Sequence, residues 1–349
     1  MDEASDILKD RIVPIDIEKI NGISDLLRGF NATSFQSRNL ARCVEIYVDM
    51  LKDPDDPTIF LGLAGAMIPA GMKKVISVMI RRGMVDVIVT TGANAYHDLV
   101  EALGYYHYKG SPHVDDKKLY NLGIDRIYDT FASEKEYREV DDRIAALADE
   151  LMIKNPELSA ISSRRFMEEL GKLIDKEGVN EEKKDSFIWN AWQHEVPIFV
   201  PALCDSSIGI ALTKHHILSR KKGLKPLMID HLKDNYEIYR IKKSSKKTGV
   251  IYIGGGVPKD FTQLLAVSLS LKMKDQKIPE RRGFARDATG EYYYQHKYAI
   301  QITTDSPQWG GLSGCTLEEA ISWGKSLVRG KELLVTVMNY CLASYSPCT

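Results

Sequence analysis

A lysine near the carboxyl end of the chain, Lys325, has the clearest potential for chemistry. The segment Leu317–Val328 has apolar residues at helical spacing, which predicts a helix with Trp323 and Lys325 at opposite borders of its apolar face. A border lysine usually reaches solvent. Where the space above it is closed and apolar, the charged form is destabilised, and the neutral amine can form Schiff bases with carbonyl or imine carbons. Thr316 and Glu319 have the spacing of a capping box, a sufficient structural reason for both.

Three further segments place small or polar residues at the ends of expected strands. The glycines Gly254–Gly256 permit positive φ and close backbone approach, which favours a ligand-facing loop. Thr90–Gly92 precedes a helix, where backbone N–H groups can approach a phosphate, although a plain turn explains these residues equally well. Asp205 could accept from ribose hydroxyls, pair with a cationic substrate or, like the serines after it, cap the next helix.

Strands and helices alternate around these segments. The expected strands are Val85–Gly92, Val196–Pro201, Gly249–Gly254 and Tyr298–Thr303, and the expected helices are Tyr96–Leu103, Ile208–Lys221, Phe261–Lys274 and Leu317–Val328. Continuous apolar character in the strands predicts that both faces of the sheet are covered. We therefore expect an α/β fold with a doubly wound, mainly parallel sheet and helices on both faces, and ligands at the carboxyl ends of its strands.

A charge-rich helical excursion interrupts this alternation at about residues 133–188, and we interpret it as solvated, with a partner-binding element as the alternative. The basic run Lys242–Lys247 is expected to be an exposed loop. Since the sequence has no internal repeat and no linker between independent domains, we expect residues 1–349 to form a single domain.

Composition narrows the class of protein. The chain has 349 residues, 44% hydrophobic and 27% charged, which is typical of globular proteins. A net charge of −1 gives no overall attraction for nucleic acid. The uncharged run Thr58–Met72 is too short to cross a membrane, and we expect no signal peptide. Five cysteines without a C-x-x-C pair, and no histidine motif, predict free thiols in a cytoplasmic protein and no metal site.

Four collinear segments resemble one enzyme family. Residues Glu319–Lys325, which read E-A-I-S-W-G-K, closely resemble the E-A-V-S-W-G-K signature around the catalytic lysine of deoxyhypusine synthase. Val89–Gly92, Pro201–Ser207 and Gly254–Lys259 follow that family's order. Because the heptapeptide is specific and the resemblance covers most of the chain, the sequence is identified as similar to this family.

The resemblance implies a Rossmann-like NAD enzyme, usually a homotetramer with active sites at subunit interfaces. The family oxidises spermidine with NAD, passes the aminobutyl group to the active lysine as an imine, and releases 1,3-diaminopropane. An acceptor amine then displaces the lysine, and the retained NADH reduces the new imine. The acceptor is a lysine of the hypusine-containing translation factor in deoxyhypusine synthase itself, and putrescine in homospermidine synthases of the same family.

The resemblance also implies roles for individual residues. Lys325 matches the imine-forming lysine, Trp323 the tryptophan of the polyamine channel, and Glu319 a carboxylate facing a substrate amine. Ser313 and His97 are the further substrate-binding positions. The implied cofactor-binding positions are Gly65, Ala66, Thr90, Thr91, Gly92, Asp205, Ser207, Gly254, Gly255, Gly256, Thr304, Asp305 and Asn339.

The departures from the family pattern concentrate at amine-recognition positions. The eukaryotic enzymes have a histidine where this chain has Asp260, which we expect to take the catalytic place. Acidic family positions are Ile210 and Leu312 here, a glutamate is His97 or its neighbour, and a late cofactor-binding aspartate is Asn339. Carboxylates lost from a polycation pocket change its charge complementarity and therefore its choice of substrate.

The sequence thus predicts an NAD-dependent 4-aminobutyl transferase that takes spermidine and an acceptor amine, with no nucleic-acid or membrane partner. A small diamine such as putrescine is the expected acceptor, giving a homospermidine-type product. A true deoxyhypusine synthase is the alternative. A second alternative is an inactive relative that binds NAD or polyamine as a sensor, for which Asp260 in place of histidine is the best support.

Overall fold

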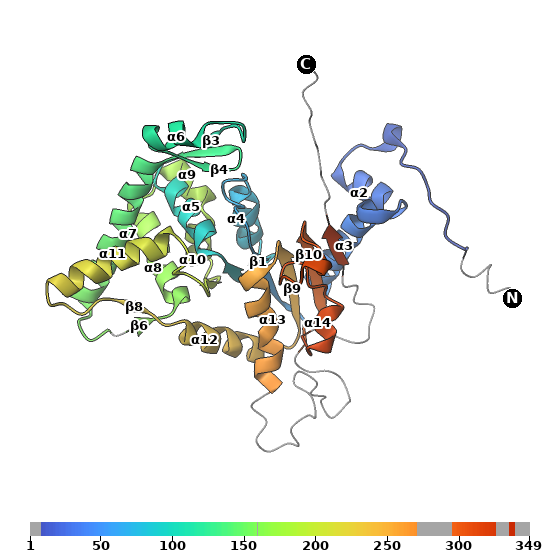
Figure 1. Ribbon diagram of the computed structural model, residues 1–349. Helices are drawn as coiled ribbons and strands as arrows, with labels where there is room; N and C mark the ends of the chain where they lie inside the picture. The colour runs from blue at the N-terminus through green and yellow to red at the C-terminus, as the bar shows by residue number, and fades with distance from the viewer. Residues whose placement is uncertain (1–7, 159, 271–294, 326–334, 339–349) are drawn as a thin grey trace.

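A parallel sheet forms the centre of the molecule. The computed structural model describes residues 8–158, 160–270, 295–325 and 335–338. Six strands lie in the order β11-β10-β9-β1-β2-β7, and every neighbouring pair is parallel (Figure 1). Their bounds are β1 Thr58–Leu63, β2 Val87–Thr90, β7 Ile198–Phe199, β9 Thr248–Ile253, β10 Tyr298–Thr303 and β11 Val335–Met338. All six carboxyl ends therefore lie at one edge of the sheet. The strands β2 and β7 lie on one side of β1, and β9, β10 and β11 lie on the other.

Both faces of the sheet are covered by helices. Side chains of a strand alternate between faces; Leu61 packs into one hydrophobic cluster, whereas Phe60 and Tyr252 pack into another. The first cluster includes residues of α3 (Phe35–Lys52) and α4 (Lys73–Arg81), and the second includes residues of α12 (His231–Ser244) and α13 (Gly256–Ser270). The expected α/β architecture, with its parallel sheet and covered faces, is confirmed.

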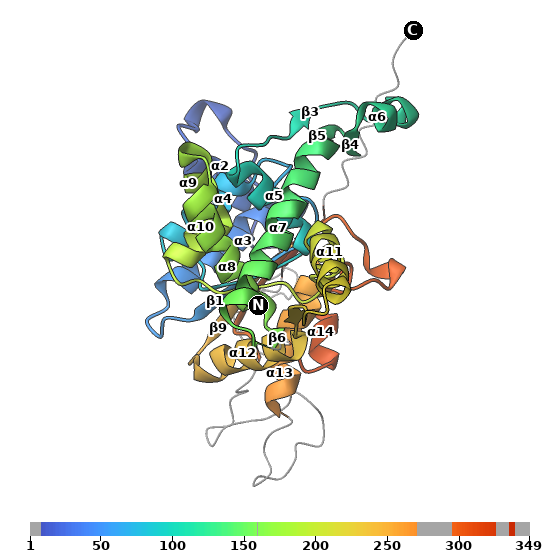
Figure 2. The ribbon, with the colours of Figure 1, turned by 90° about the vertical axis from the view of Figure 1, so that its left-hand side faces the viewer.

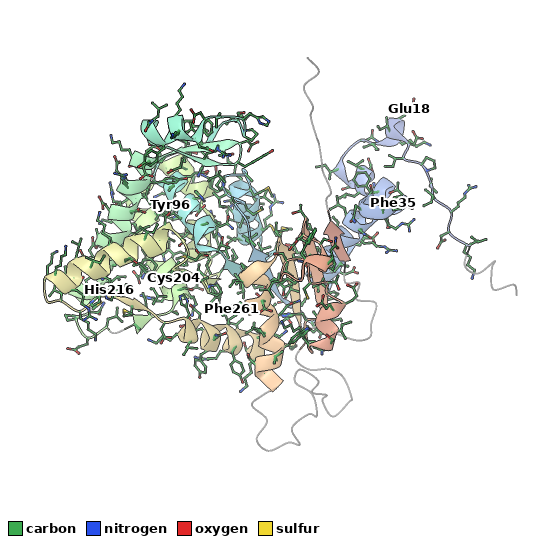
Figure 3. All side chains as sticks on the ribbon, viewed as in Figure 1. Glu18, Phe35, Tyr96, Cys204, His216 and Phe261 are labelled. Atoms are coloured by element: carbon green, nitrogen blue, oxygen red, sulfur yellow. The ribbon has the colours of Figure 1, made fainter. Side chains whose placement is uncertain are left out.

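A block of helices stands beyond β2 and β7 and faces the viewer in Figure 2. Its members are α5 Gly92–Ala102, α7 Glu134–Lys154, α8 Ser163–Glu177, α9 Asn180–Asp185, α10 Phe187–Gln193 and α11 Ser207–Lys221. Figure 3 shows Tyr96 inside this block. Ile144, Phe166, Leu170 and Phe187, which belong to the predicted excursion, are fully buried in the main core. The excursion is helical as expected. Its interpretation as solvated holds only for its charged side, where Lys135, Arg138 and Glu139 are exposed, because the same helices bury apolar faces in the core.

Smaller elements complete the described chain. A three-stranded sheet holds β3 (Tyr108–Lys109), β4 (Ile124–Ile127) and β5 (Thr130–Ser133), and a two-stranded one holds β6 (Ala160–Ile161) and β8 (Met228–Ile229). The remaining helices are η1 Ile17–Lys19, α2 Ile23–Asn31, α6 Asp116–Leu122, η2 Pro307–Trp309 and α14 Glu319–Ser322.

Further sequence-based predictions need correction. The helix expected over Leu317–Val328 ends early, since α14 stops at Ser322 and the residues after Lys325 lie outside the described part of the chain. The run Lys242–Lys247 is only partly an exposed loop, because Lys242 is a buried residue of α12. Its ammonium donates to Thr248 and lies near His296, and burial lowers its pKa.

Candidate active site

A cavity of about 690 Å³ lies at the carboxyl edge of the sheet, between α13, the loop after β10 and α14. It contains the predicted residues Lys325, Asp260, Trp323 and Glu319 together. The other lining residues are Lys259, Gln263, Leu264, Val267, Gly310, Gly311, Leu312, Cys315 and Ser322. Residues that are distant in sequence thus form one site, as expected for the strand-end loops of an α/β sheet.

The end of α14 delivers Lys325 to this cavity. Gly324 has a left-handed backbone, with φ +70°, and its N–H donates to Ile321 O at 2.9 Å. The Lys325 N–H donates to Ala320 O at 3.0 Å, which completes the hydrogen-bond pattern of a Schellman helix end. Lys325 therefore follows the end of the helix. The sequence-based prediction, which placed Lys325 at the border of a longer helix, is wrong. Its side chain is 13% exposed.

A carboxylate and an indole ring surround the Lys325 amine. Its Nζ lies 2.6 Å from Asp260 Oδ1, an ion pair between α14's end and α13. The same Nζ lies 5.6 Å from the centre of the Trp323 ring, within cation–π distance. A carboxylate so close to an amine can stabilise the ammonium and can accept its proton, so the pair fits a lysine that must alternate between charged and neutral forms.

A buried lysine and a buried glutamine bind the backbone of the loops next to the cavity. Lys259 Nζ donates to Gln301 Oε1 at 2.8 Å, to Leu312 O at 3.1 Å and to Cys315 O. Burial lowers the pKa of Lys259. Gln301 Nε2 donates to Gly254 O at 3.0 Å and to Ser313 O at 2.7 Å. The pair fixes the loop that leads from β10 to α14 and hence to Lys325.

Neither Lys259 nor Gln301 was assigned a role from the sequence. A signal was present for Gln301, because a glutamine inside the otherwise apolar strand Tyr298–Thr303 must find buried partners. Cys315, Gln263 and Ser322 also line the cavity without a sequence signal.

The predicted glycine loop lies beside the cavity. Gly254 and Gly256 have positive φ values of +79° and +56°. The Gly256 N–H donates to Ser313 Oγ at 3.0 Å, and a Cβ on Gly255 would overlap the backbone of Ser313. Ser313, expected to bind substrate, therefore anchors this loop. A side chain at Gly256 would extend into open space, so the start of α13 remains accessible to a ligand.

The strand ends and loops that follow β9, β1 and β2 contact one another at this edge of the sheet. The Gly254 loop packs on Ala64, next to Gly65, which has φ +78°, and Ala66. Thr90 Oγ1 donates to Leu63 O at 3.2 Å. Hence the loops after β9, β1 and β2 form one continuous row, which contains most of the residues expected to bind cofactor.

Several of these residues have local structural roles. Thr91 caps α5 by accepting from the Asn94 N–H, and Gly92 packs against Ser206. Ser206 occupies the N-cap position of α11, so Asp205 is not the cap; Asp205 is exposed and Ser207 is half-buried.

The last predicted cofactor positions lie on the loop after β10 or beyond the described chain. Thr304 is exposed, and Asp305 Oδ1 accepts from the Ser306 N–H at 3.0 Å. Asn339 lies outside the described residues.

His97 belongs to a different cluster. It is buried on α5, where its Nδ1 lies 3.0 Å from His107 Nε2 and 3.2 Å from the Tyr137 hydroxyl. Glu101 accepts from His107 and pairs with Lys73. His97 is not among the residues that line the Lys325 cavity. Within this chain its expected role beside the substrate is therefore not supported.

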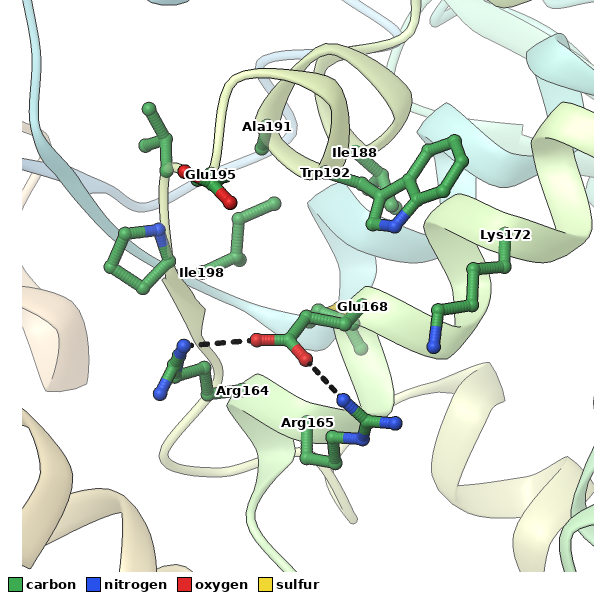
Figure 4. A pocket seen from close by; sticks show the side chains of 12 residues that line it. Arg164, Arg165, Glu168, Lys172, Ile188, Ala191, Trp192, Glu195 and Ile198 are labelled. Carbon is green, nitrogen blue, oxygen red and sulfur yellow. Dashed lines mark hydrogen bonds and ion pairs between the residues drawn. The ribbon is translucent and has the colours of Figure 1, made fainter.

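A second cavity, of about 260 Å³, lies at the opposite end of β7 (Figure 4). Three of its charged groups pair with one another: Glu168 accepts from Arg165 at 2.8 Å and pairs with Arg164 at 3.0 Å. Because ligands of parallel sheets bind at the carboxyl ends of strands, the Lys325 cavity is the stronger candidate. Among the residues that the structure describes, no three His, Cys, Asp or Glu side chains could hold a metal ion. None of the described helices is long and apolar enough to span a membrane.

The family model and the sequence relatives identify one family. The family model for deoxyhypusine synthase matches residues 25–339. The Methanosarcina mazei protein named "Probable deoxyhypusine synthase 2" is 48% identical over 93% of this chain and 85% of its own length. The "Deoxyhypusine synthase-like protein" of Chlorobaculum tepidum is 42% identical over 91% of this chain and 83% of its own. The structure described as "Crystal Structure of a putative deoxyhypusine synthase from Entamoeba histolytica" has a TM-score of 0.57 at 19% identity. The match covers 84% of this chain and 88% of that chain, and it supports the fold alone.

Proposed function

The chain belongs to the deoxyhypusine synthase family, and on that basis we propose that it is an NAD-dependent transferase of the aminobutyl group of spermidine. The observation that carries this proposal is the Lys325–Asp260 ion pair in a cavity that also contains Trp323 and Glu319. A polyamine is a chain of methylene and ammonium groups. The Trp323 indole can pack against its methylenes and ammonium groups, and the Glu319 carboxylate can pair with an ammonium group.

The residues of the site suit transfer by amine exchange. Lys325 gives its proton to Asp260, and the neutral amine attacks the imine carbon of the oxidised donor. The bond from that carbon to the departing nitrogen breaks as this nitrogen takes up the proton, which releases 1,3-diaminopropane and leaves the aminobutyl group as an imine on Lys325. The acceptor amine then displaces Lys325 in the same manner.

The row of strand-end loops fits NAD. The strand order β11-β10-β9-β1-β2-β7, which runs outward on both sides of β1, supports the proposal of a doubly wound, Rossmann-like sheet, and dinucleotides bind such sheets where the strand order reverses. There the Gly254–Gly256 loop opens α13 with accessible backbone, and Gly92 opens α5. Helix N-termini of this kind favour phosphates. Bound NAD would accept the hydride that oxidises the donor and return it to the final imine.

A small diamine is the acceptor that we favour. The family's acidic positions are Ile210 and Leu312 here, both exposed, and Leu312 lines the cavity. The loss of these carboxylates changes the charge complementarity of the site and therefore its choice of acceptor amine. The lysine of a hypusine-type translation factor is the second candidate.

A second copy of the chain would complete the site. Trp323, Trp309 and Leu312 are 63%, 73% and 46% exposed at or next to the cavity, and such adjoining apolar side chains mark an interface. We therefore include in the proposal a homo-oligomer, a tetramer by family likeness, that covers this mouth.

Borohydride trapping tests the chemistry. The full chain is incubated with spermidine and NAD, reduced with borohydride, and digested for mass spectrometry. The expected result is an aminobutyl adduct on Lys325 with release of 1,3-diaminopropane. Lys325→Arg should abolish the adduct, whereas the exposed Lys117→Arg on α6 should retain it.

Two further outcomes decide between the candidates. Label transferred from spermidine to putrescine, and not to a hypusine-type translation factor, supports the small acceptor; the reverse supports deoxyhypusine synthase activity. NAD binding without any adduct or diaminopropane would overturn the transferase proposal in favour of a sensor.

A further inference from the structure

Positive charge is concentrated in one part of this nearly neutral chain. Residues 214–247 contain eleven Lys and Arg against three Asp and Glu, although the whole chain has a net charge of −1. The segment runs from the outer half of α11, where Figure 3 labels His216, through β8 and along α12 at the lower border of Figure 1.

Most of these cations are exposed and unpaired. Lys214 pairs with Asp142, Lys247 pairs with Asp53, and Lys242 is buried. The other eight are exposed, and within the described part of the chain none of them forms an ion pair. These eight, which we call the basic face, are Arg220, Lys221, Lys222, Lys225, Lys233, Arg240, Lys243 and Lys246. Unpaired like charges raise the local potential, which a partner of opposite charge would relieve.

Apolar side chains lie within the basic face. Leu224, Met228 and Leu232 follow one another between its cations and are 58%, 48% and 77% exposed. On α12, Lys233, Tyr236, Arg240 and Lys243 recur at intervals of three and four residues, so they form one stripe along the helix.

We propose that the basic face docks a protein segment whose acidic and apolar side chains alternate at helical spacing. The exposed leucines favour a protein over a nucleic acid, because a phosphate backbone offers no apolar partner to them. Six of the eight cations are lysines, whereas arginine is the residue suited to bidentate phosphate contacts.

This surface is separate from the amine site. None of the basic-face residues lines the Lys325 cavity, and a positive surface would repel a polyamine. Docking there is therefore independent of aminobutyl transfer, and each can fail without the other.

Fluorescence anisotropy tests the proposal with the full chain. The probe is a labelled peptide of glutamate and leucine at helical spacing, compared with polyglutamate of the same charge and with a polyuridylate RNA. The glutamate–leucine peptide is expected to bind about tenfold more tightly than either comparison probe, and more weakly as salt rises. The triple variants K221E/K222E/K225E and K233E/R240E/K243E should each weaken it by about tenfold.

The control variant K117E/K118E/K135E makes the same change of charge at exposed residues of α6 and α7 and should bind as the parent does. Equal weakening in this control would overturn the proposal, since only net charge would matter. RNA binding as tight as that of the peptide would assign the face to nucleic acid, and dissociation of an oligomer in the basic-face variants would assign it to a second copy. Circular dichroism melting confirms that each variant is folded.

Discussion

Asp260 places a carboxylate 2.6 Å from the Lys325 amine, where the eukaryotic family pattern has an imidazole. Both groups can accept a proton, but the deprotonated carboxylate is an anion whereas the deprotonated imidazole is neutral. The ion pair therefore stabilises the ammonium before reaction and must be broken as the proton moves. The replacement of histidine by Asp260 is also the best support for the alternative that this chain is an inactive relative, so the role of this carboxylate decides between the two interpretations.

Replacing Asp260 tests that role. Asp260→Asn keeps the size of the side chain but removes the proton acceptor, so the rate of adduct formation on Lys325 should fall by about a hundredfold. Asp260→His restores an acceptor and should recover part of the rate. Trapped adduct is measured against time at several pH values. An asparagine variant with the rate and pH profile of the parent would show that the carboxylate is only structural.

His97 makes the stability of the molecule depend on pH. Burial and the neighbouring His107 lower the pKa of His97 from 6.5 to about 4. Between these values the unfolded state binds a proton that the folded state excludes, so this contribution is complete above pH 6.5 and is lost as pH falls toward 4. At about pH 5 the expected loss in free energy of unfolding is about 2 kcal/mol.

Urea unfolding at about pH 7.5 and about pH 5 measures this loss. His97→Gln should reduce the difference between the two pH values, whereas the exposed His113→Gln should keep it. Glu101 and Tyr137 also face this cluster, so the comparison uses the change between pH values and not the absolute stability. If His97→Gln retained the full difference, another group would be responsible.

At the scale of the element, the end of α14 is the feature on which the site depends. Gly324 holds φ at +70°, and the hydrogen bond from Lys325 to Ala320 O exists only in that conformation. Gly324→Ala should lower the free energy of unfolding by about 1 kcal/mol and slow adduct formation, because it moves Lys325 relative to Asp260. Gly324→Asn tolerates the left-handed region and should lose less of both. Equal behaviour of the two variants in urea unfolding and trapping would contradict this assignment.

The same helix shows what the sequence can and cannot reveal. The apolar spacing continues through Gly324 to Val328, so periodicity alone extends the helix, whereas the break depends on a backbone angle that no spacing encodes. Tyr298–Thr303 was predicted to the residue because a β-branched run is bounded on both sides. β1, Thr58–Leu63, was missed because its apolar run continues into the following loop.

Tertiary contacts account for the rest. The sequence predicts Lys242 to be part of a charged loop, whereas in the structure its ammonium contacts Thr248 and His296 in the interior. Asp260 and Lys325 are separated by 65 positions in the sequence, so their spacing could not predict that they are in contact. Only the resemblance of their segments to the family pattern indicated that both belong to one site. The single-domain organisation stays a prediction.

In the whole molecule, the mouth of the Lys325 cavity combines exposed apolar side chains with a proposed reaction that water would interrupt. The proposed imine on Lys325 would be hydrolysed by water, yet Trp323 and Leu312 are 63% and 46% exposed at that mouth. A partner copy seated over Trp309 would bury these side chains and exclude water at once.

Trp309→Glu tests this arrangement, because a charge at a buried interface cannot be compensated by apolar neighbours. Sedimentation velocity should show the parent as an oligomer and the variant as a smaller species, with adduct yield lowered by about tenfold as the imine hydrolyses. Tyr120→Glu, at an exposed aromatic of α6 away from the cavity, should leave both unchanged. A variant that keeps its mass but loses its adduct would place Trp309 in substrate binding, and one that loses its mass but keeps its adduct would show that each chain encloses its own imine.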